Sequence, residues 1–398
     1  MIIKPAKRTD SLHPYYFSIK NPQVAALSKE RVAKGLDPVI NMGIGAPDGM
    51  PPAEAIEELC SCARKSDSHK YQNYFGLPEL RQAYSDWYRR YYHVELDPVS
   101  EIQPLVGSKE GILMICLTFL DEGDKVLMPD PGYPTYTSAT ALTQADVITY
   151  SLKQELGWQP DFEELEKTDL SGVKLMWVNY PNMPTGAPAT HELYSKLVAF
   201  AKKHHIMVVN DNPYSFILND EPMSILEVEG AKDCCIELNS LSKAHNMSGW
   251  RLGMVAGDED SIREIRKVKS QMDSGMFKPL QMAAIKALAA GPEWFEALNA
   301  EYRRRKEYVW KLFDTIGAKY EKDAQGLFVW GKVTADNPYA QGGDPSKTLG
   351  ERVSDKLLFE KGVFITPGFI FGHGGDDYVR ASLCAPIPMI EKAIEAIK

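Results

Sequence analysis

The chain has 398 residues, of which 44% are hydrophobic and 25% are charged, so it is long enough for two or three domains with a large core. Its formal net charge of −9, with no basic run to offset it, argues against a nucleic-acid partner. Residues 1–8 lack the apolar core of a signal peptide, and the longest apolar stretch, 112–120, is far short of the roughly 20 residues that span a bilayer. The six cysteines match no metal motif, so we expect reduced thiols, no metal and no membrane partner in a cytoplasmic protein.

The first hundred residues predict an arm, two helices and a ligand-contacting turn. Residues 1–40 combine an arm with a helix at 23–34, where apolar residues recur at helical spacing. The glycine-rich stretch 43–48 is not a dinucleotide-binding loop, because no third glycine follows and a proline stands where the helix should open. We interpret it as a turn that lets a small ligand approach the backbone. A further turn precedes a helix at 80–92.

A candidate anion site follows in the next segment. Residues 102–106 predict a strand, 107–111 a glycine turn and 112–120 a helix. The free amides at the start of such a helix point at a ligand and favour negative charge. On its own this signal is weak, because glycine turns join many strands to helices.

Four apolar runs in the middle of the chain each end in polar residues. Helical segments such as 190–203 lie between them, which predicts a mainly parallel sheet with helices on both sides. Ligands bind such sheets beyond the carboxyl ends of the strands, so we expect the polar residues to converge on one pocket. The runs are 125–128, 174–178, 206–209 and 235–238.

The pattern changes after residue 265 and predicts a second, α+β domain. We therefore divide the chain into an N-terminal arm with part of the small domain (1–45), a large domain (46–280) and a C-terminal small domain (281–398). The expected elements of the last part are largely helical residues 281–312, a strand at 327–330, a helix at 349–360, strands at 363–366 and 378–383, and a final helix at 389–397.

Lys243 is the strongest candidate for chemistry, because it follows Ser240 and Ser242 and precedes Arg251 by eight positions. A desolvated lysine beside a fixed cation loses its proton more easily and becomes nucleophilic. The serines and the arginine fork can hold a phosphate. A reactive lysine beside a phosphate clamp is what pyridoxal phosphate requires; a surface lysine in an ordinary loop is the alternative.

Three further residues at strand ends suit the same cofactor. A buried carboxylate at Asp211 can keep the pyridine nitrogen protonated, which makes the ring an electron sink. Tyr214 can donate to the phenolic oxygen, and Tyr133 can stack on the ring. The alternative for Asp211 is a turn residue that caps the next segment.

These motifs, in this order from residue 43 to residue 380, resemble the fold-type I pyridoxal-phosphate enzymes and, among them, the class I and II aminotransferases. The resemblance implies an α/β fold: a large domain with a mainly parallel sheet flanked by helices, and a smaller α+β domain. It implies that Lys243 is the Schiff-base lysine and carries the proton between carbon atoms. The stretch 107–111 is similar to the branch that contains diaminopimelate and alanine aminotransferases.

The resemblance also implies a role for each remaining site residue. The residues that bind the cofactor are Ser108, Lys109, Ser240, Ser242 and Arg251 at the phosphate, Tyr133 on the ring face, Asp211 at the ring nitrogen and Tyr214 at the phenolic oxygen. Tyr71 resembles a tyrosine that reaches the phosphate in the neighbouring subunit, which implies a homodimer with shared active sites. Gly45 and Arg380 resemble the residues that bind the substrate's α-carboxylate.

The chain departs from the family directly before Pro184. The family usually has an asparagine there that bonds the phenolic oxygen, but this chain has Met183, whose thioether cannot donate. Either Asn182 takes over the contact after a shift of the loop, or the contact is absent.

We expect transamination, in which the α-amino group of an amino acid moves to a 2-oxo acid through pyridoxamine phosphate. A carbon–sulfur β-lyase that uses the same cofactor is the alternative. A cofactor-sensing transcription regulator is disfavoured, since only about 40 residues precede Gly43 and they contain no basic recognition helix. The sequence does not identify the side chain of the amino-acid substrate. The residues expected to contact that side chain are Tyr16, Ile44, Met276 and Phe277.

Overall fold

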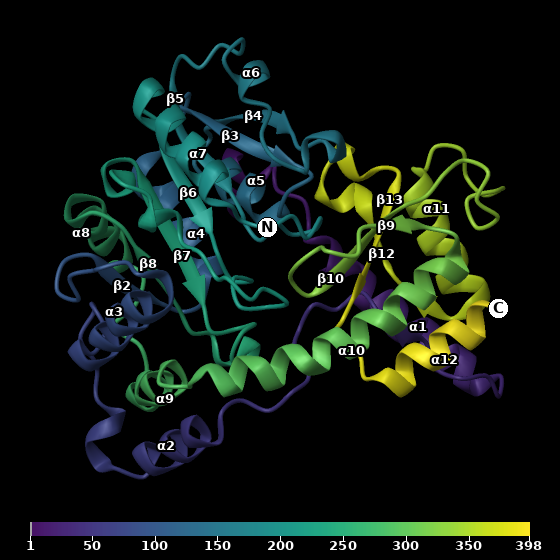
Figure 1. Cartoon of the computed structure of the whole chain (residues 1–398), viewed down its shortest axis with the longest axis horizontal. Helices are drawn as coiled ribbons and strands as arrows, with labels where there is room; N and C mark the ends of the chain where they lie inside the picture. Colours follow the sequence, from purple (N-terminus) through teal and green to yellow (C-terminus); the bar gives the residue numbers. More distant parts are fainter. Residues whose placement is uncertain (1) are drawn as a thin grey trace.

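A seven-stranded sheet forms the centre of the larger part of the computed structural model, which describes residues 2–398 (Figure 1). Across the sheet the strands are β2 (Ile102–Leu105), β8 (Gly253–Ala256), β7 (Cys235–Ser240), β6 (Met207–Asp211), β5 (Val173–Val178), β3 (Lys125–Asp130) and β4 (Asp146–Ser151). Neighbours from β7 to β4 are parallel, whereas β8 is antiparallel to both β7 and β2. The prediction of a mainly parallel sheet flanked by helices is confirmed.

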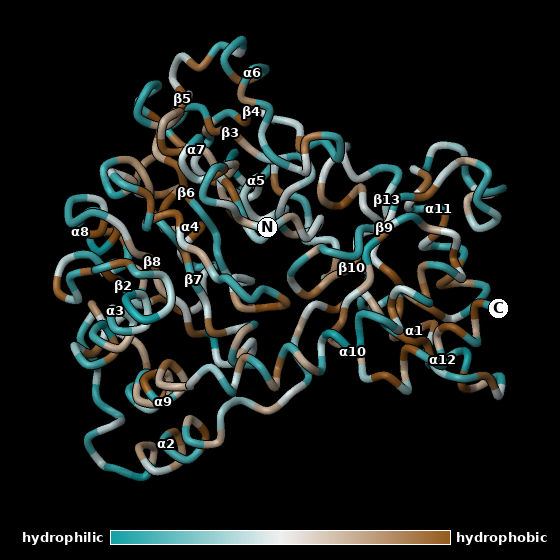
Figure 2. Tube along the Cα trace, viewed as in Figure 1, coloured by the Kyte–Doolittle hydropathy of each residue, from teal (hydrophilic) through white to brown (hydrophobic). Residues whose placement is uncertain are grey.

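Both faces of this sheet are covered, which explains why its central strands are continuous apolar runs. One face packs against α4 (Ser108–Phe119), α5 (Pro134–Ala141) and α8 (Glu259–Lys269). The other packs against α3 (Pro78–Tyr92) and α7 (His191–His204). Figure 2 shows the hydrophobic residues gathered on the central strands β5 and β6.

The remaining helices follow local sequence signals. The side chain of Thr190 accepts a hydrogen bond from the amide of Leu193 at the start of α7 (3.1 Å), as an N-cap residue does. A proline opens α10 at its first position, where the missing amide costs nothing. The other helices are α1 (Tyr16–Ala33), α2 (Ala53–Ala63), α6 (Phe162–Leu165), α9 (Lys278–Leu288), α10 (Pro292–Ile316), α11 (Leu349–Lys356) and α12 (Ile387–Ile397).

The smaller part contains a four-stranded antiparallel sheet in the order β12 (Thr366–Pro367), β13 (Tyr378–Ser382), β10 (Phe328–Lys332) and β9 (Lys319–Tyr320). The N-terminal strand β1 (Ile40–Asn41) pairs in parallel with β11 (Val363–Phe364). The long helix α10 runs from beside α9 to the smaller part (Figure 1). The N-terminal strand β1 and the C-terminal helix α12 therefore both belong to this part, where they contact each other.

The structure changes several expected boundaries. The helix predicted at 23–34 begins at Tyr16 and includes Pro22, because Tyr16 and Phe17 pack against a small core around Phe364. The helix predicted at 112–120 begins at Ser108, inside the stretch 107–111 that was predicted as a glycine turn. The sequence did not indicate β4, whose residues are mostly exposed at the sheet edge, or the short antiparallel β8. Within residues 2–398, no helix has the length and hydrophobicity to cross a membrane.

Candidate active site

A cavity of about 530 Å³ lies at the carboxyl ends of the central strands. Its opposite wall comes from the smaller part, through Phe328 of β10, Phe371 and Arg380 of β13. The structure brings together here all predicted site residues except two: those lining the cavity are Gly45, Ser108, Lys109, Tyr133, Asp211, Tyr214, Ser240, Ser242, Lys243, Arg251 and Arg380. Convergence of the strand ends, predicted from the sequence, is thus observed.

Lys243 occupies the turn after β7, and its ammonium donates a hydrogen bond to the carbonyl of Gly45 (2.6 Å). Burial lowers the pKa of Lys243, and the positive charges of Arg380 and Arg251 act in the same direction. The amine therefore loses its proton more readily than an exposed lysine does. The Nζ atom lies 6.0 Å from the centre of the Tyr214 ring.

Asp211, at the end of β6, has one oxygen engaged and one free. The hydroxyl of Tyr136 donates to Oδ2 (2.9 Å), and the Tyr136 ring stacks on Trp177 with centroids 4.7 Å apart. Oδ1 is buried and has no hydrogen-bond partner among residues 2–398. Burial raises the pKa of Asp211 to about 7. A buried acceptor without a donor is unfavourable, so Oδ1 fits a ligand that supplies a protonated nitrogen.

Arg380 is a buried guanidinium without an acidic partner in the described chain. It is 4% exposed and donates to the Met183 thioether and the Gly43 carbonyl, both at 3.2 Å, while its Nε has no partner. Its carbon Cζ lies 3.8 Å from the centre of the Phe328 ring and 4.7 Å from that of Phe371. Burial lowers the pKa of Arg380 to about 10. This arrangement suits an anion such as a carboxylate, for which arginine offers two parallel donors.

A second group of donors lies on the other side of the cavity. Ser108 and Lys109 occupy the first turn of α4, whose amides have no partner inside the helix. Gly107 precedes them at a φ of 78°, and a Cβ there would lie 2.1 Å from the guanidinium of Arg251. Only glycine lets the arginine reach this helix start. The hydroxyls of Ser240 and Ser242, 2.9 Å apart, complete a group of donors that suits a phosphate. Residues 107–109, 240, 242 and 251 are called the phosphate cup below.

Two tyrosines border the space between Lys243 and Asp211. Tyr133 directly precedes α5 and meets the Tyr136 ring edge-on, with centroids 5.5 Å apart. Burial raises the pKa of Tyr133 and of Tyr214, which keeps both phenols protonated and able to donate. The space between them is therefore bordered by phenol donors, an amine and a free carboxylate oxygen.

Comparison with known proteins identifies the family. The sequence profile described as "Aminotransferase class I and II" matches residues 37–397. The chain belongs to this aminotransferase family. It transfers amino groups, and the resemblance inferred from its motifs is confirmed.

Relatives of this aminotransferase match over nearly the full length. It is 38% identical to an LL-diaminopimelate aminotransferase of Dehalococcoides mccartyi, over 98% of this chain and 97% of the relative. It is 37% identical to the LL-diaminopimelate aminotransferase of Aquifex aeolicus, with the same coverage. Among solved structures, substrate-bound BacF of Bacillus subtilis is 33% identical, with a TM-score of 0.91 over 100% of this chain and 97% of that one.

Two predicted site residues lie outside the cavity of this aminotransferase. Tyr71 is 91% exposed and lines a separate hollow with residues 274–277. The Asn182 carboxamide is buried within its own turn: its oxygen accepts from the amide and hydroxyl of Thr185, and its nitrogen donates to the Asn179 carbonyl. This placement does not support Asn182 as the replacement for the missing asparagine, because all these bonds would have to break.

Met183 does line the cavity, where its thioether contacts Arg380. Asn179 supports this position, since its side-chain oxygen accepts from the Met183 amide (2.8 Å). The residue that departs from the family pattern therefore faces the guanidinium, and it offers the cavity a soft, apolar surface.

Sequence reasoning missed several residues of the cavity. Tyr15, rather than the neighbouring Tyr16, lines it, and the Lys109 ammonium lies 4.6 Å from the centre of the Tyr15 ring. Of the four expected side-chain contacts only Ile44 lines the cavity. Tyr136 was recognisable only as part of the proline-bracketed turn after β3, and Phe371 carried no signal, because its loop meets the cavity only through the tertiary fold.

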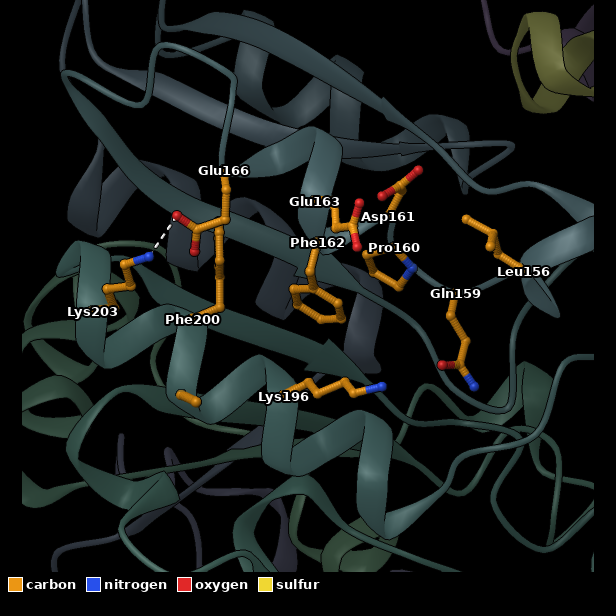
Figure 3. Close-up of a pocket in the computed structure, with 11 residues that line it drawn as sticks. Leu156, Gln159, Pro160, Asp161, Phe162, Glu163, Glu166, Lys196, Phe200 and Lys203 are labelled. Atoms are coloured by element: carbon orange, nitrogen blue, oxygen red, sulfur yellow. Dashed lines mark hydrogen bonds and ion pairs between the residues drawn. The ribbon is translucent and has the colours of Figure 1, made fainter.

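Another hollow, of about 680 Å³, lies between α6 and α7 but contains none of the predicted site residues (Figure 3). Phe162 and Phe200 form its apolar part, and Lys203 bonds Glu166 at its edge (2.6 Å). Its charged residues are paired or exposed, which is typical of a surface groove.

Proposed function

We propose that this aminotransferase uses pyridoxal 5′-phosphate, bound in the cavity with Lys243 at its reactive carbon. The observation that carries the proposal is that three reactive or charged groups share one cavity without an ion-pair partner in the described chain: the amine of Lys243, the carboxylate of Asp211 with its free Oδ1, and the guanidinium of Arg380. An amine, a hydrogen-bond acceptor for a protonated ring nitrogen and a cation that binds a carboxylate are what transfer of an α-amino group by this cofactor requires.

The residues present fit the cofactor at each of its polar groups. The phosphate cup supplies helix-start amides, two hydroxyls and a guanidinium for the phosphate. Asp211 would accept a hydrogen bond from the protonated ring nitrogen, Tyr133 would cover the ring and Tyr214 would donate to the phenolic oxygen. When bound, pyridoxal phosphate withdraws electrons from the carbon that carries the amino group. Asp211 strengthens that effect by holding a negative charge at the ring nitrogen.

Lys243 then carries the proton at the substrate's α-carbon. Its lowered pKa leaves a fraction of the amine neutral, as a general base requires. Its hydrogen bond to Gly45 holds the Nζ atom on the side of the cavity where residues 43–46 meet it. One residue can thus remove a proton from one carbon and return it to another.

Arg380 binds the substrate α-carboxylate and so fixes the orientation of the amino acid. Phe328 and Phe371 flank its guanidinium and keep water from it. In such surroundings an ionic hydrogen bond is stronger than in water. The backbone at Gly45 borders the same space.

We also propose a homodimer in which Tyr71 reaches the phosphate of the partner's cofactor. Support comes from the exposure of Tyr71 and of nearby apolar residues, which a single chain leaves uncovered. These residues are Tyr74, Phe75, Met272 and Phe277. Light scattering of the purified protein tests the dimer. Six free cysteines agree with the proposed cytoplasmic location.

The decisive experiment is a single half-reaction. The purified protein is loaded with pyridoxal phosphate and mixed with one amino acid at a time, and pyridoxamine phosphate and the 2-oxo acid are measured. LL-diaminopimelate comes first, because relatives at 37–38% identity carry its name. Stoichiometric pyridoxamine phosphate supports transfer. Formation of pyruvate, ammonia and the thiol homocysteine from cystathionine, without pyridoxamine phosphate, would instead support the β-lyase.

A further inference from the structure

Lys269, the last residue of α8, is a charged side chain enclosed by the protein. Its side chain is 1% exposed. The ammonium donates to both oxygens of Glu110 (3.0 and 3.2 Å) and to Oδ2 of Asp273 (2.6 Å). Burying an ammonium is unfavourable unless its partners are well placed, so this triad fixes the positions of the two acids.

Glu110 connects the triad to the phosphate cup. It lies in the first turn of α4, and its Oε2 accepts a hydrogen bond from the amide of Val106 (2.6 Å). Val106 directly precedes Gly107, which packs against the guanidinium of Arg251. Lys269 therefore orients the carboxylate that holds the turn from β2 into α4.

Asp273 connects the same ammonium to the segment of Tyr71. Its Oδ1 accepts from the amide of Gly275 (3.0 Å). Gly275 has a φ of 90°, and a Cβ there would lie 2.6 Å from the carbonyl oxygen of Gln72. Residues 274–277 and 69–72 line one hollow of about 460 Å³. Because the Tyr71 side chain is exposed, the backbone around it sets its position.

We propose that Lys269 is a positioning residue that holds the phosphate cup and the Tyr71 segment in a fixed relation. The inference rests on the proposed function, in which the cup binds the phosphate of its own subunit and Tyr71 that of the partner. One buried ammonium then aligns donors for the cofactors of both subunits.

A double-mutant cycle on the full-length protein tests this role. The measured quantity is the dissociation constant of pyridoxal phosphate, followed by quenching of protein fluorescence. Tyr71→Phe should raise it about tenfold through loss of one hydrogen bond to a charged group. Asp273→Asn should raise it several-fold. The dissociation constant of the double variant should not exceed that of the single variant that binds less tightly, because both changes remove the same contact. Lys269→Met should raise the dissociation constant more than either single change, since it also removes the partner that orients the Glu110 carboxylate.

The matched control is Lys267→Met, on the same helix. Lys267 forms an exposed ion pair with Glu264, so its loss should leave the dissociation constant unchanged. Urea unfolding of each apoprotein measures general destabilisation. Such destabilisation would change the dissociation constant by the same factor whether residue 71 is tyrosine or phenylalanine. If Lys269→Met does not fold, the Asp273–Tyr71 cycle alone decides, since Asp273 is partly exposed.

Two results would overturn the inference, and they can be told apart. Independent, multiplicative effects of Asp273→Asn and Tyr71→Phe would show that Lys269 does not act through Tyr71, while leaving the proposed dimer site intact. An unchanged dissociation constant in Tyr71→Phe would remove both the inference and the proposed role of Tyr71 in the partner's site.

Discussion

Replacing Asp211 by asparagine should stabilise the apoprotein while weakening its hold on the cofactor. Burial raises the pKa of Asp211 from 3.8 to about 7. An acid whose folded-state pKa lies above its unfolded-state value destabilises the fold progressively as the pH rises from the lower value to the higher one. At about 1.4 kcal/mol for each pH unit, the penalty is about 4 kcal/mol at pH 8. The penalty is about 1.5 kcal/mol at pH 5, where the Asp211 carboxyl of the folded protein is still protonated.

Asparagine keeps the shape of the side chain and an oxygen that can accept from Tyr136, but it has no charge. Asp211→Asn should therefore gain about 4 kcal/mol of unfolding free energy at pH 8 and clearly less at pH 5. The effect on cofactor binding is the opposite: the variant should bind pyridoxal phosphate less tightly than the parent protein does. The variant loses a buried ion pair of about 3–5 kcal/mol, so the dissociation constant should rise by between two and four orders of magnitude.

The assay is urea unfolding of the apoprotein at both pH values, beside fluorescence titration with pyridoxal phosphate. Asp130→Asn is the control: Asp130 ends β3, which β5 separates from β6 in the same sheet, and burial raises its pKa. Its side chain accepts a hydrogen bond from the Gly374 amide outside the cavity. It should leave the dissociation constant unchanged. An Asp211→Asn protein with equal stability changes at pH 5 and pH 8, or with unweakened cofactor binding, would refute the reasoning.

Four further changes test the other assignments. Lys243→Ala should abolish turnover yet still bind pyridoxal phosphate through the cup, and multiple turnover without an added amine would contradict the role of Lys243. Tyr214→Phe should lose far less activity than Asp211→Ala, since it removes one hydrogen bond of roughly 1.5–3 kcal/mol rather than a buried charge; steady-state rates compare them. Arg380→Lys should slow turnover of an α-amino acid but not of the same amine without its carboxylate, and equal slowing of both would argue against carboxylate binding. Met183→Asn should lower the pKa at which the bound cofactor changes colour, because an added amide donor favours the phenolate, whereas Asn182→Ala should not shift that pKa. A spectrophotometric titration in which Met183→Asn has no effect and Asn182→Ala raises the pKa would restore Asn182 as the donor.

The sequence by itself determined the parallel core of the large sheet and most of the cavity. The apolar runs that become β3, β5, β6 and β7 each end in polar residues, and parallel strands bring their carboxyl ends together however the surrounding side chains pack. Asp211 and Lys243 could therefore be placed in one site before the fold was known. Motif order added Arg380, which lies far along the chain from both.

Only the tertiary structure decided how individual side chains are used. The choice between Tyr15 and Tyr16 depends on the rotation of the arm at the start of α1. Asn182 turns inward because Thr185 and Asn179 satisfy its carboxamide, which no spacing predicts. Lys269 looks like one more surface cation at the end of a helix until the fold brings Glu110 to it from 159 positions away. Strand direction follows from patterns along the chain, whereas the partner of a buried polar group is set by contacts between distant segments, and the sequence does not display those contacts.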